Sequence, residues 1–396
     1  MRGDWEMNNF RFYAPTYFSF GEGSEKDVSQ LIKRFGGSKV LLHYGGGSIK
    51  QNGVFDAITE SLQKAGIPYV ELGGVMPNPR SGLVYKGIEL CRKEGIDFIL
   101  AVGGGSTIDS AKAIALGVPY EGDFWDYYAT DKPVDEALPI GTVLTIAAAG
   151  SEGSPDSVIT LEEGMLKWAT SGEALRPKFS ILNPAFTCSL SAYQTACGIT
   201  DIMVHVCERY FTRTKNVETT DRLCEAVLKA VIEEAPKVMK NLEDYEARAN
   251  IMWAGMVAHN NICGVDREQD WASHGIEHEL SAFYDCAHGA GLAVITPAWM
   301  TYVYKQDVLR FAQFAVRVWG CDMNFENPEI TALEGIARFK SFLKAIGMPL
   351  NFKELGAKEE DIPAMVDHLL RSEGASIGNF VKLYAKDVEA IYRLAL

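Results

Sequence analysis

The sequence predicts two domains of different class, an α/β domain in the N-terminal half and an all-α domain in the C-terminal half. In the first half, short apolar runs alternate with stretches whose apolar residues recur at helical spacing, which indicates βαβ units around a parallel sheet. From about Ser189 onward, helical periods dominate and β-rich runs are scarce. We therefore predict domains over residues 1–185 and 186–396, with the boundary near Asn183 and Pro184.

The predicted strands of the N-terminal half are continuously apolar, as expected for strands that are covered on both faces. Glycine triplets follow two of them directly. The predicted strands cover 39–44, 67–72, 97–102 and 138–146, and helices are predicted over 54–65, 81–94 and 107–116. In the C-terminal half, helices are predicted over 199–211, 219–241, 244–261, 271–282, 308–318 and 330–345.

Charge and cysteine usage narrow the class of protein. The chain carries 38 Lys and Arg against 52 Asp and Glu, a net charge of −14, which disfavours a nucleic-acid-binding surface. It has no apolar run of about 18 residues, and its first residues lack the apolar core of a secretion signal. The eight cysteines contain no CxxC pair. We therefore expect a cytoplasmic protein with reduced thiols and no membrane partner.

Two glycine clusters are candidates for binding a nucleotide. Gly103, Gly104, Gly105 and Ser106 follow a predicted strand and open a helix, where free N–H groups and the helix dipole favour a pyrophosphate. This segment departs from the GxGxxG motif at Ile108, where the motif has its last glycine. A tight strand-to-helix turn is the alternative interpretation of the cluster.

The second cluster comprises Gly45, Gly46, Gly47 and Ser48, with Lys50 close behind. It lacks the acidic residue that binds the ribose 2′-hydroxyl of NAD at a strand end. Small residues, a hydroxyl and a lysine suit the 2′-phosphate of NADP instead. A flexible turn is the alternative interpretation.

Histidine and carboxylate spacing points to a metal site in the C-terminal half. Asp201 and His205 stand at i and i+4 of a predicted helix, and His274 and His278 repeat that spacing. His288 follows between small residues that leave room for a ligand. One carboxylate and three imidazoles suit Fe(II) or Zn(II) and leave a coordination position for a substrate oxygen.

A competing pattern overlaps this cluster. The stretch from His274 to His278 fits HxxEH, in which two histidines bind zinc and Glu277 is the general base of a protease. That hypothesis leaves both glycine clusters, Asp201, His205 and His288 without a role.

Taken together, the chain resembles the iron-containing (group III) alcohol dehydrogenases, most closely their NADPH-dependent butanol dehydrogenase and aldehyde reductase branch. The resemblance extends over nearly the whole chain. It rests on the four candidate metal ligands and on three sequence segments. These are FYAPTYFSFGEGS near the start, PNPR at 77–80 and AVGGGSTIDSAKAIA at 101–115.

The resemblance implies a Rossmann-like dinucleotide-binding domain and a helical metal domain, the dehydroquinate-synthase-like architecture, with the active site in the cleft between them. It implies a homodimer, Asp201, His205, His274 and His288 as metal ligands, and His278 as a candidate proton relay. The implied NADP(H)-binding residues are Gly45, Gly46, Gly47, Ser48, Asn78, Gly103, Gly104, Gly105, Ser106, Asp109, Thr145 and Lys167.

One stretch departs from the family pattern. Where the family has PxTGSE, this chain has Ala147 and Ala149 in place of the proline and the threonine. The threonine hydroxyl normally contacts the cofactor, and its loss removes a hydrogen bond that is worth about 0.5–1.5 kcal/mol.

The resemblance therefore implies a metal-dependent oxidoreductase that interconverts short- and medium-chain aldehydes and primary alcohols with NADP(H) and favours aldehyde reduction. The metal polarises the carbonyl oxygen, and the nicotinamide donates hydride to the carbonyl carbon. Two alternatives remain open. One is an NAD(H)-dependent polyol dehydrogenase of the same fold, and the other is an NADP-binding protein without catalysis.

Overall fold

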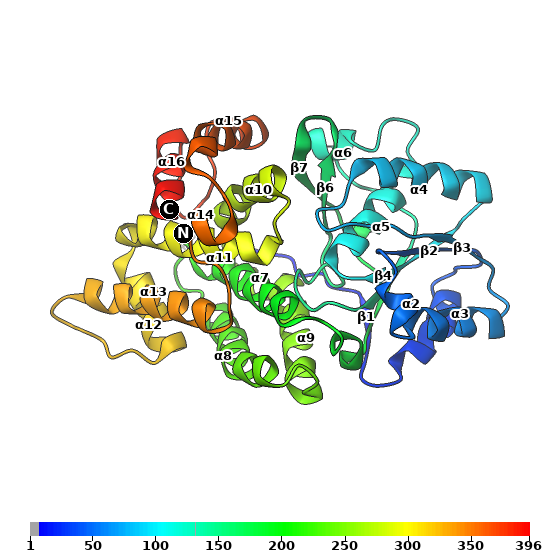
Figure 1. Cartoon of the computed structure of the whole chain (residues 1–396), viewed down its shortest axis with the longest axis horizontal. Helices are drawn as coiled ribbons and strands as arrows, with labels where there is room; N and C mark the ends of the chain where they lie inside the picture. The colour runs from blue at the N-terminus through cyan, green and yellow to red at the C-terminus, as the bar shows by residue number, and fades with distance from the viewer. Residues whose placement is uncertain (1–7, 131) are drawn as a thin grey trace, which may run out of the picture. The chain divides into compact units, whose positions relative to one another are not determined.

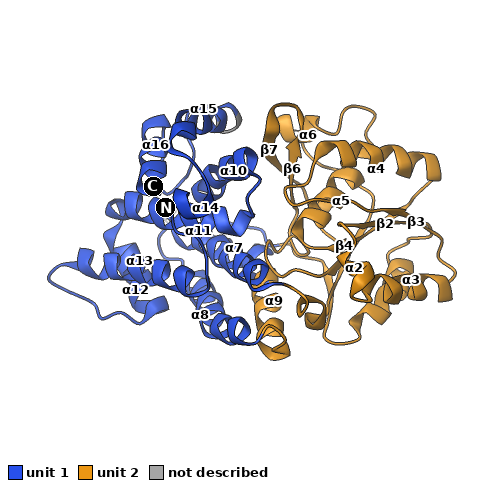
Figure 2. Ribbon diagram, viewed as in Figure 1, with its two compact units in different colours: residues 1–12, 191–241, 257–396 blue, residues 13–190, 242–256 orange. Residues whose placement is uncertain are grey.

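The computed structural model describes residues 8–130 and 132–396, and the chain divides into two compact units (Figure 2). Unit 1 holds the described part of Met1–Phe12 together with Ser191–Asn241 and Val257–Leu396. Unit 2 holds Tyr13–Leu190, apart from residue 131, and Leu242–Met256. Residues 1–7 of the predicted N-terminal domain lie outside the described part.

Unit 2 is built on a parallel six-stranded sheet with the strand order β1-β8-β5-β4-β2-β3, which confirms the predicted α/β class (Figure 1). The four strands predicted from sequence correspond to β2, β3, β4 and β5. The strands are β1 Tyr17–Phe20, β2 Val40–Tyr44, β3 Tyr69–Leu72, β4 Phe98–Gly103, β5 Ile140–Leu144 and β8 Phe179–Leu182.

Helices cover both faces of this sheet, which explains why its central strands β2, β4 and β5 are buried throughout. Leu41 and Ile99 point into a core shared with α4 and α5, whereas Leu42 and Leu100 point into a second core shared with α1 and α3. The unit also contains an antiparallel hairpin of β6 and β7. The remaining elements of this part are α1 Val28–Arg34, α2 Ser48–Gln51, α3 Val54–Lys64, α4 Ser81–Glu94, α5 Gly105–Gly117, α6 Asp126–Ala129, β6 Asp156–Leu161 and β7 Leu166–Ser171.

The described residues of unit 1 form helices and no strand, apart from an isolated bridge between Ile377 and Leu383, which confirms the predicted all-α class. The helices from α7 onward are α7 Ala192–Tyr210, α8 Glu218–Lys240, α9 Tyr245–His259, α10 Ala272–Tyr284, α11 His288–Val303, α12 Val308–Trp319, α13 Pro328–Ala345, α14 Phe352–Leu355, α15 Ile362–Glu373 and α16 Ala385–Leu394. Short 3₁₀ turns connect elements in both units at Ser24–Asp27, Glu163–Met165, Glu173–Leu175, Pro184–Thr187, Tyr304–Gln306 and Glu359–Asp361.

The observed division differs from the predicted one at residues 8–12, which belong to unit 1, and in the placement of α9. Most of this helix belongs to unit 2, although it lies well within the predicted domain 186–396. Met252 is fully buried in the core shared with α4 and α5, and Trp253 packs edge to face on Phe18 and Phe20 of β1. Helical periodicity predicts the helix but not the core on which it packs.

Among the described residues, no helix combines the length and the apolar character that a membrane span requires.

Candidate functional site

Helix α7 presents Asp201 and His205 on one face. A capping box between Ser191 and Gln194 starts the helix, so both residues fall within its regular middle turns. Oδ1 of Asp201 lies 3.3 Å from Nδ1 of His205, and both side chains are buried.

Two further helices complete the predicted ligand set. Nε2 of His274, on α10, and Nε2 of His288, the first residue of α11, lie 3.7 and 3.8 Å from Oδ1 of Asp201. All four predicted ligands therefore gather around one carboxylate oxygen within unit 1. Cβ atoms at Gly289 and Gly291 would collide with the Cys197 carbonyl and the Glu277 carboxylate, so these small residues make room for protein groups.

Three polar atoms of this cluster lack hydrogen-bond partners. Oδ1 of Asp201, Nδ1 of His205 and Nε2 of His274 are buried and unpaired. Such groups are rare in proteins because each loses its bonds to water. A divalent cation would satisfy all three, and the mixed carboxylate and imidazole donors suit iron or zinc. The residues present therefore fit a resident metal.

The charge balance within the cluster also favours a cation. Burial alone would raise the pKa of Asp201, but His274 and His288 hold it below its usual value. Burial lowers the pKa of His205 well below its usual value. Burial also opposes protonation of His274, but Asp201 and Glu208 outweigh it and raise the pKa to about 9. A metal would replace the proton on His274.

The HxxEH residues do not form one site. His274 joins Asp201 and His205, whereas His278 lies with Glu277 and His288. The His278 and His288 ring centroids are 5.6 Å apart. Glu277 is fully buried and accepts hydrogen bonds from Ser281 and His288, so it is unsuited to act as the base of a protease.

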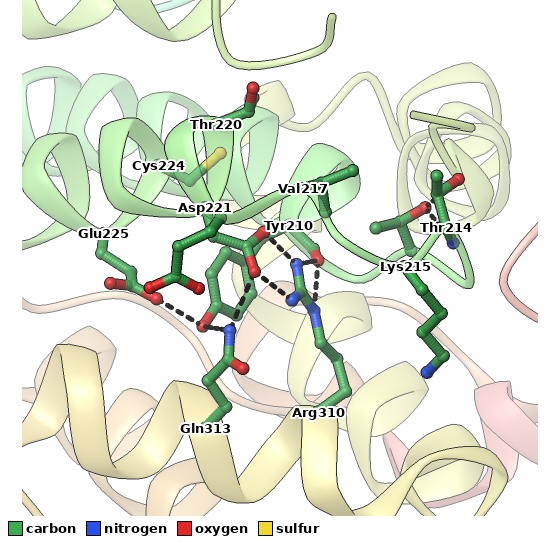
Figure 3. A network of polar contacts seen from close by, with 12 residues as sticks. Tyr210, Thr214, Lys215, Val217, Thr220, Asp221, Cys224, Glu225, Arg310 and Gln313 are labelled. Atoms are coloured by element: carbon green, nitrogen blue, oxygen red, sulfur yellow. Dashed lines mark hydrogen bonds and ion pairs between the residues drawn. The ribbon is translucent and has the colours of Figure 1, made fainter. Parts of the chain in front are cut away.

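A buried ionic network fixes the carboxyl-terminal end of α7 (Figure 3). Asp221 of α8 accepts hydrogen bonds from Arg310, Gln313 and Arg267. The Arg310 guanidinium also donates to the carbonyl of Tyr210, the last residue of α7, at 2.8 Å. The network thereby ties the helix that carries two predicted ligands to α8 and α12.

In unit 2, the predicted cofactor loops meet at the carboxyl edge of the sheet. β2 and β5 flank β4 in parallel, with Tyr44 opposite Val102 and Leu144 opposite Gly103. The loops 45–48, 103–106 and 145–149 therefore adjoin, at the sheet edge where open α/β folds bind nucleotides.

The loop after β4 is closely packed. Cβ atoms added to Gly104 and Gly105 would lie 3.1 Å from Ile146 and 2.9 Å from the Cβ of Ala149. Helix α5 begins at Gly105, so its free N–H groups lie at this loop. The arrangement could hold a pyrophosphate.

Asp109 and Lys112 on α5 form hydrogen bonds with the segment 151–158. Asp109 accepts from the Ser151 hydroxyl at 2.6 Å and the Val158 amide at 3.1 Å. Lys112 is fully buried and donates to the carbonyls of Ser151, Ser154 and Asp156. Burial lowers the pKa of Lys112 to about 8. Sequence reasoning gave Lys112 no role, although it follows Asp109 by three residues in the glycine-rich phrase.

Sequence reasoning also missed Glu71. Its carboxylate lies 2.9 Å from Nζ of Lys50 and accepts from the Tyr44 hydroxyl at 2.7 Å. It stands on β3, beside β2, so no local pattern joins it to the Gly45–Ser48 loop.

Three of the other predicted cofactor residues follow strands of the sheet at the same edge, namely Asn78, Ser106 and Thr145. Asn78 follows β3 with a positive φ of 52°, and the Thr145 amide donates to the Gly103 carbonyl. Lys167 lies on β7, opposite Thr160 of β6, and Ser106 lies in the first turn of α5.

Comparison with known proteins identifies the family. The model "Iron-containing alcohol dehydrogenase" matches residues 15–184, and the model "Fe-containing alcohol dehydrogenase family, C-terminal" matches residues 195–396. The chain is 44% identical to the probable NADH-dependent butanol dehydrogenase 2 of Bacillus subtilis, covering 98% of this chain and 100% of that protein. It is 36% identical to the NADPH-dependent aldehyde reductase YqhD of Escherichia coli, covering 92% and 93%.

Solved structures agree over the full chain. A crystal structure of NADH-dependent butanol dehydrogenase A from Thermotoga maritima matches with a TM-score of 0.95 at 42% identity, covering 98% of this chain and 99% of that one. A crystal structure of Escherichia coli YqhD matches with a TM-score of 0.94 at 32% identity, with the same coverage. These matches confirm the resemblance read from the sequence: the chain belongs to the iron-containing alcohol dehydrogenase family and is an oxidoreductase of alcohols and aldehydes.

Proposed function

We propose that this enzyme is a metal-dependent reductase of short- and medium-chain aldehydes that uses NADP(H). The observation that carries the proposal is the set of unpaired buried atoms on Asp201, His205 and His274. Their carboxylate and imidazole groups are suitable ligands for a divalent cation. Without a metal, these buried atoms would remain unpaired, which is unfavourable.

Asp201, His205, His274 and His288 would hold Fe(II) or Zn(II). The bound cation supplies a Lewis acid that polarises the aldehyde oxygen and stabilises negative charge that develops on it. Asp201 and His205 hold their spacing through α7, whose end is fixed by the network around Asp221.

The carboxyl edge of the sheet in unit 2 would bind the cofactor. The amides that open α5 at Gly105 would hold the pyrophosphate, and Asp109 and Lys112 keep the adjoining segment in place. The bound nicotinamide supplies the hydride for the carbonyl carbon. We assign the delivery of a proton to the product oxygen to His278, which is partly exposed one helical turn after His274.

NADP(H) is favoured over NAD(H) because no acid lies on the loop after β2, while Ser48 and Lys50 follow its glycines. NADH is the second candidate. It is favoured by the names of the butanol dehydrogenases at 39–44% identity and by Glu71, which pairs with Lys50.

We also propose a cytoplasmic homodimer. All eight cysteines are free thiols, as suits a reducing compartment. Strand β1 lies at an edge of the sheet with Tyr17 and Phe20 each 42% exposed, so a second copy could pair along it.

Butyraldehyde-dependent oxidation of NADPH and of NADH, measured side by side with purified enzyme, tests the proposal. We expect turnover with a higher kcat/KM for NADPH. A higher kcat/KM for NADH would overturn the cofactor assignment, and turnover of polyols alone would overturn the substrate assignment.

A further inference from the structure

Two buried carboxylates, on Glu277 and Glu208, are hydrogen-bonded to histidines that are predicted metal ligands, and neither carboxylate is itself a predicted ligand. We propose that Glu277 and Glu208 are positioning residues that hold His288 and His274 with their Nε2 atoms toward the metal and strengthen metal binding. This inference rests on the metal site of the proposed function. It gives Glu277 of the HxxEH motif a role other than that of a base.

Glu277 holds the ring of His288 from the side opposite the metal. The carboxylate is fully buried on α10 and accepts a hydrogen bond from Nδ1 of His288. Because a carboxylate can only accept, Nδ1 carries the proton and the lone pair of Nε2 is free for a metal. The second carboxylate oxygen accepts from the Ser281 hydroxyl at 2.5 Å, which fixes the orientation of Glu277.

The surrounding backbone makes room for this carboxylate. Gly291 lies one turn into α11, and a Cβ there would collide with Oε1 and Cγ of Glu277. A glycine in a helix interior is less favourable than an alanine. Its presence here lets α11, which begins with His288, approach Glu277.

Glu208 repeats the arrangement on α7. Its Oε1 accepts from Nδ1 of His274 at 3.1 Å and from the His274 amide at 2.9 Å, and its side chain is buried. Glu208 follows His205 by three residues, so α7 provides two ligands and orients a third. In both pairs Nδ1 donates to a carboxylate while Nε2 faces Asp201.

Helix α10, which carries Glu277, also provides a matched control. Glu279 of α10 is buried and its carboxylate lies 2.5 Å from Nδ1 of His368, in a Glu–His pair without a predicted ligand. Replacing Glu279 by glutamine therefore removes an equivalent buried charge from α10 and leaves the metal cluster intact.

The test measures metal affinity rather than activity. Wild type, Glu277→Gln, Glu208→Gln and Glu279→Gln are stripped of metal, and Zn(II) affinity is measured by competition with a chromophoric chelator. Loss of such an outer carboxylate typically weakens metal binding about 10- to 100-fold. We expect that loss in Glu277→Gln and Glu208→Gln, an altered Co(II) absorption spectrum in both, and wild-type values in Glu279→Gln.

Unchanged Zn(II) affinity and an unchanged Co(II) spectrum in a folded Glu277→Gln protein would overturn the inference. An equal loss in Glu279→Gln would also overturn it, because the effect would then be structural. If Glu277→Gln does not fold, Ser281→Ala tests the orientation of Glu277, because it removes the hydroxyl that donates to Oε1. We expect several-fold weaker Zn(II) binding there, and wild-type affinity would contradict the inference. A wild-type protein that binds neither Zn(II) nor Co(II) would instead contradict the proposed function.

Discussion

Two buried histidines, His43 in unit 2 and His274 in unit 1, respond to burial in opposite ways. His43 bonds to the Leu72 carbonyl and the Ser110 hydroxyl, and burial lowers its pKa to about 4. His274 is equally buried, but Asp201 and Glu208 raise its pKa to about 9. The difference lies in the carboxylates, which surround one ring and are absent from the hydrogen bonds of the other.

The contrast extends to the two candidate binding regions, one in each unit. The carboxyl edge of the sheet in unit 2 offers backbone amides and glycines, which suit an anionic cofactor. The cluster in unit 1 offers acids and imidazoles, which suit a cation. A substitution in one of these regions can therefore test it separately from the other.

The largest expected effect comes from Asp201→Ala, which removes the carboxylate around which the other ligands gather. We expect metal content, measured by elemental analysis, and aldehyde reduction to fall by at least about 100-fold, beyond the range of outer-sphere changes. Cofactor binding, followed by fluorescence, should stay within about twofold of wild type, because its residues lie in unit 2. Full metal content at full rate would show that the ligand assignment is wrong.

His43→Gln removes the buried histidine of unit 2. Below pH 6.5 the unfolded chain takes up a proton at His43, while the folded chain does not until pH is about 4. The unfolding free energy of wild type should therefore fall by about 3 kcal/mol from this residue alone as pH drops through that window, and should not change from it above pH 6.5. Denaturant titrations at pH 7.5, 6, 5 and 4.5 should show a shallower fall for His43→Gln. Equal slopes for the two proteins would exclude His43 as a source of the acid sensitivity.

Ala149→Thr restores the hydroxyl of the family pattern beside Gly105. A recovered hydrogen bond of about 0.5–1.5 kcal/mol corresponds to about 2- to 10-fold tighter cofactor binding. Fluorescence titration with NADPH measures it, and Ala147→Pro serves as a comparison without a new hydroxyl. Weaker binding in Ala149→Thr would indicate that the alanine is required by the packing of the 103–106 loop.

The smallest expected effect concerns cofactor choice at the Lys50–Glu71 pair. Glu71→Gln should raise, and Lys50→Met should lower, the ratio of NADPH to NADH affinity by about 2- to 5-fold, the scale of an exposed ion pair. Glu60→Gln, which breaks the exposed pair with Lys64 on α3, is the control. Equal changes in the affinities for NADPH and NADH would show that the 2′-phosphate does not bind at the Lys50–Glu71 pair.

Most elements with a clear period were predicted from sequence, but the amphipathic helices α15 and α16 were not. Helix α11 was missed because it is apolar on every side and contains Pro297, so it has no polar face to set a period. The β6–β7 hairpin and β8 were not predicted either. Strand β8 has only four residues, and polar residues such as Asp156, Lys167 and Ser171 interrupt the apolar pattern of β6 and β7. The packing of α9 in unit 2 depends on Met252 and Trp253 meeting a distant core.

The candidate site shows the same limit. The i, i+4 pairs of Asp201 with His205 and of His274 with His278 were visible in sequence, but the grouping of His278 with Glu277 rather than with Asp201 was not. Glu71, Glu208 and Glu277 acquire their partners only through tertiary contacts. The HxxEH pattern singled out Glu277, but as the base of a protease, and it did not indicate that Glu277 and Glu279 bond to different histidines.

The most direct test of the account is metal reconstitution. Enzyme stripped by a chelator is supplied anaerobically with Fe(II) or Zn(II), and butyraldehyde-dependent NADPH oxidation is measured before and after the addition. The account predicts negligible turnover without metal, recovery at about one equivalent per chain, and no recovery in Asp201→Ala. Full turnover by the metal-free enzyme would contradict it.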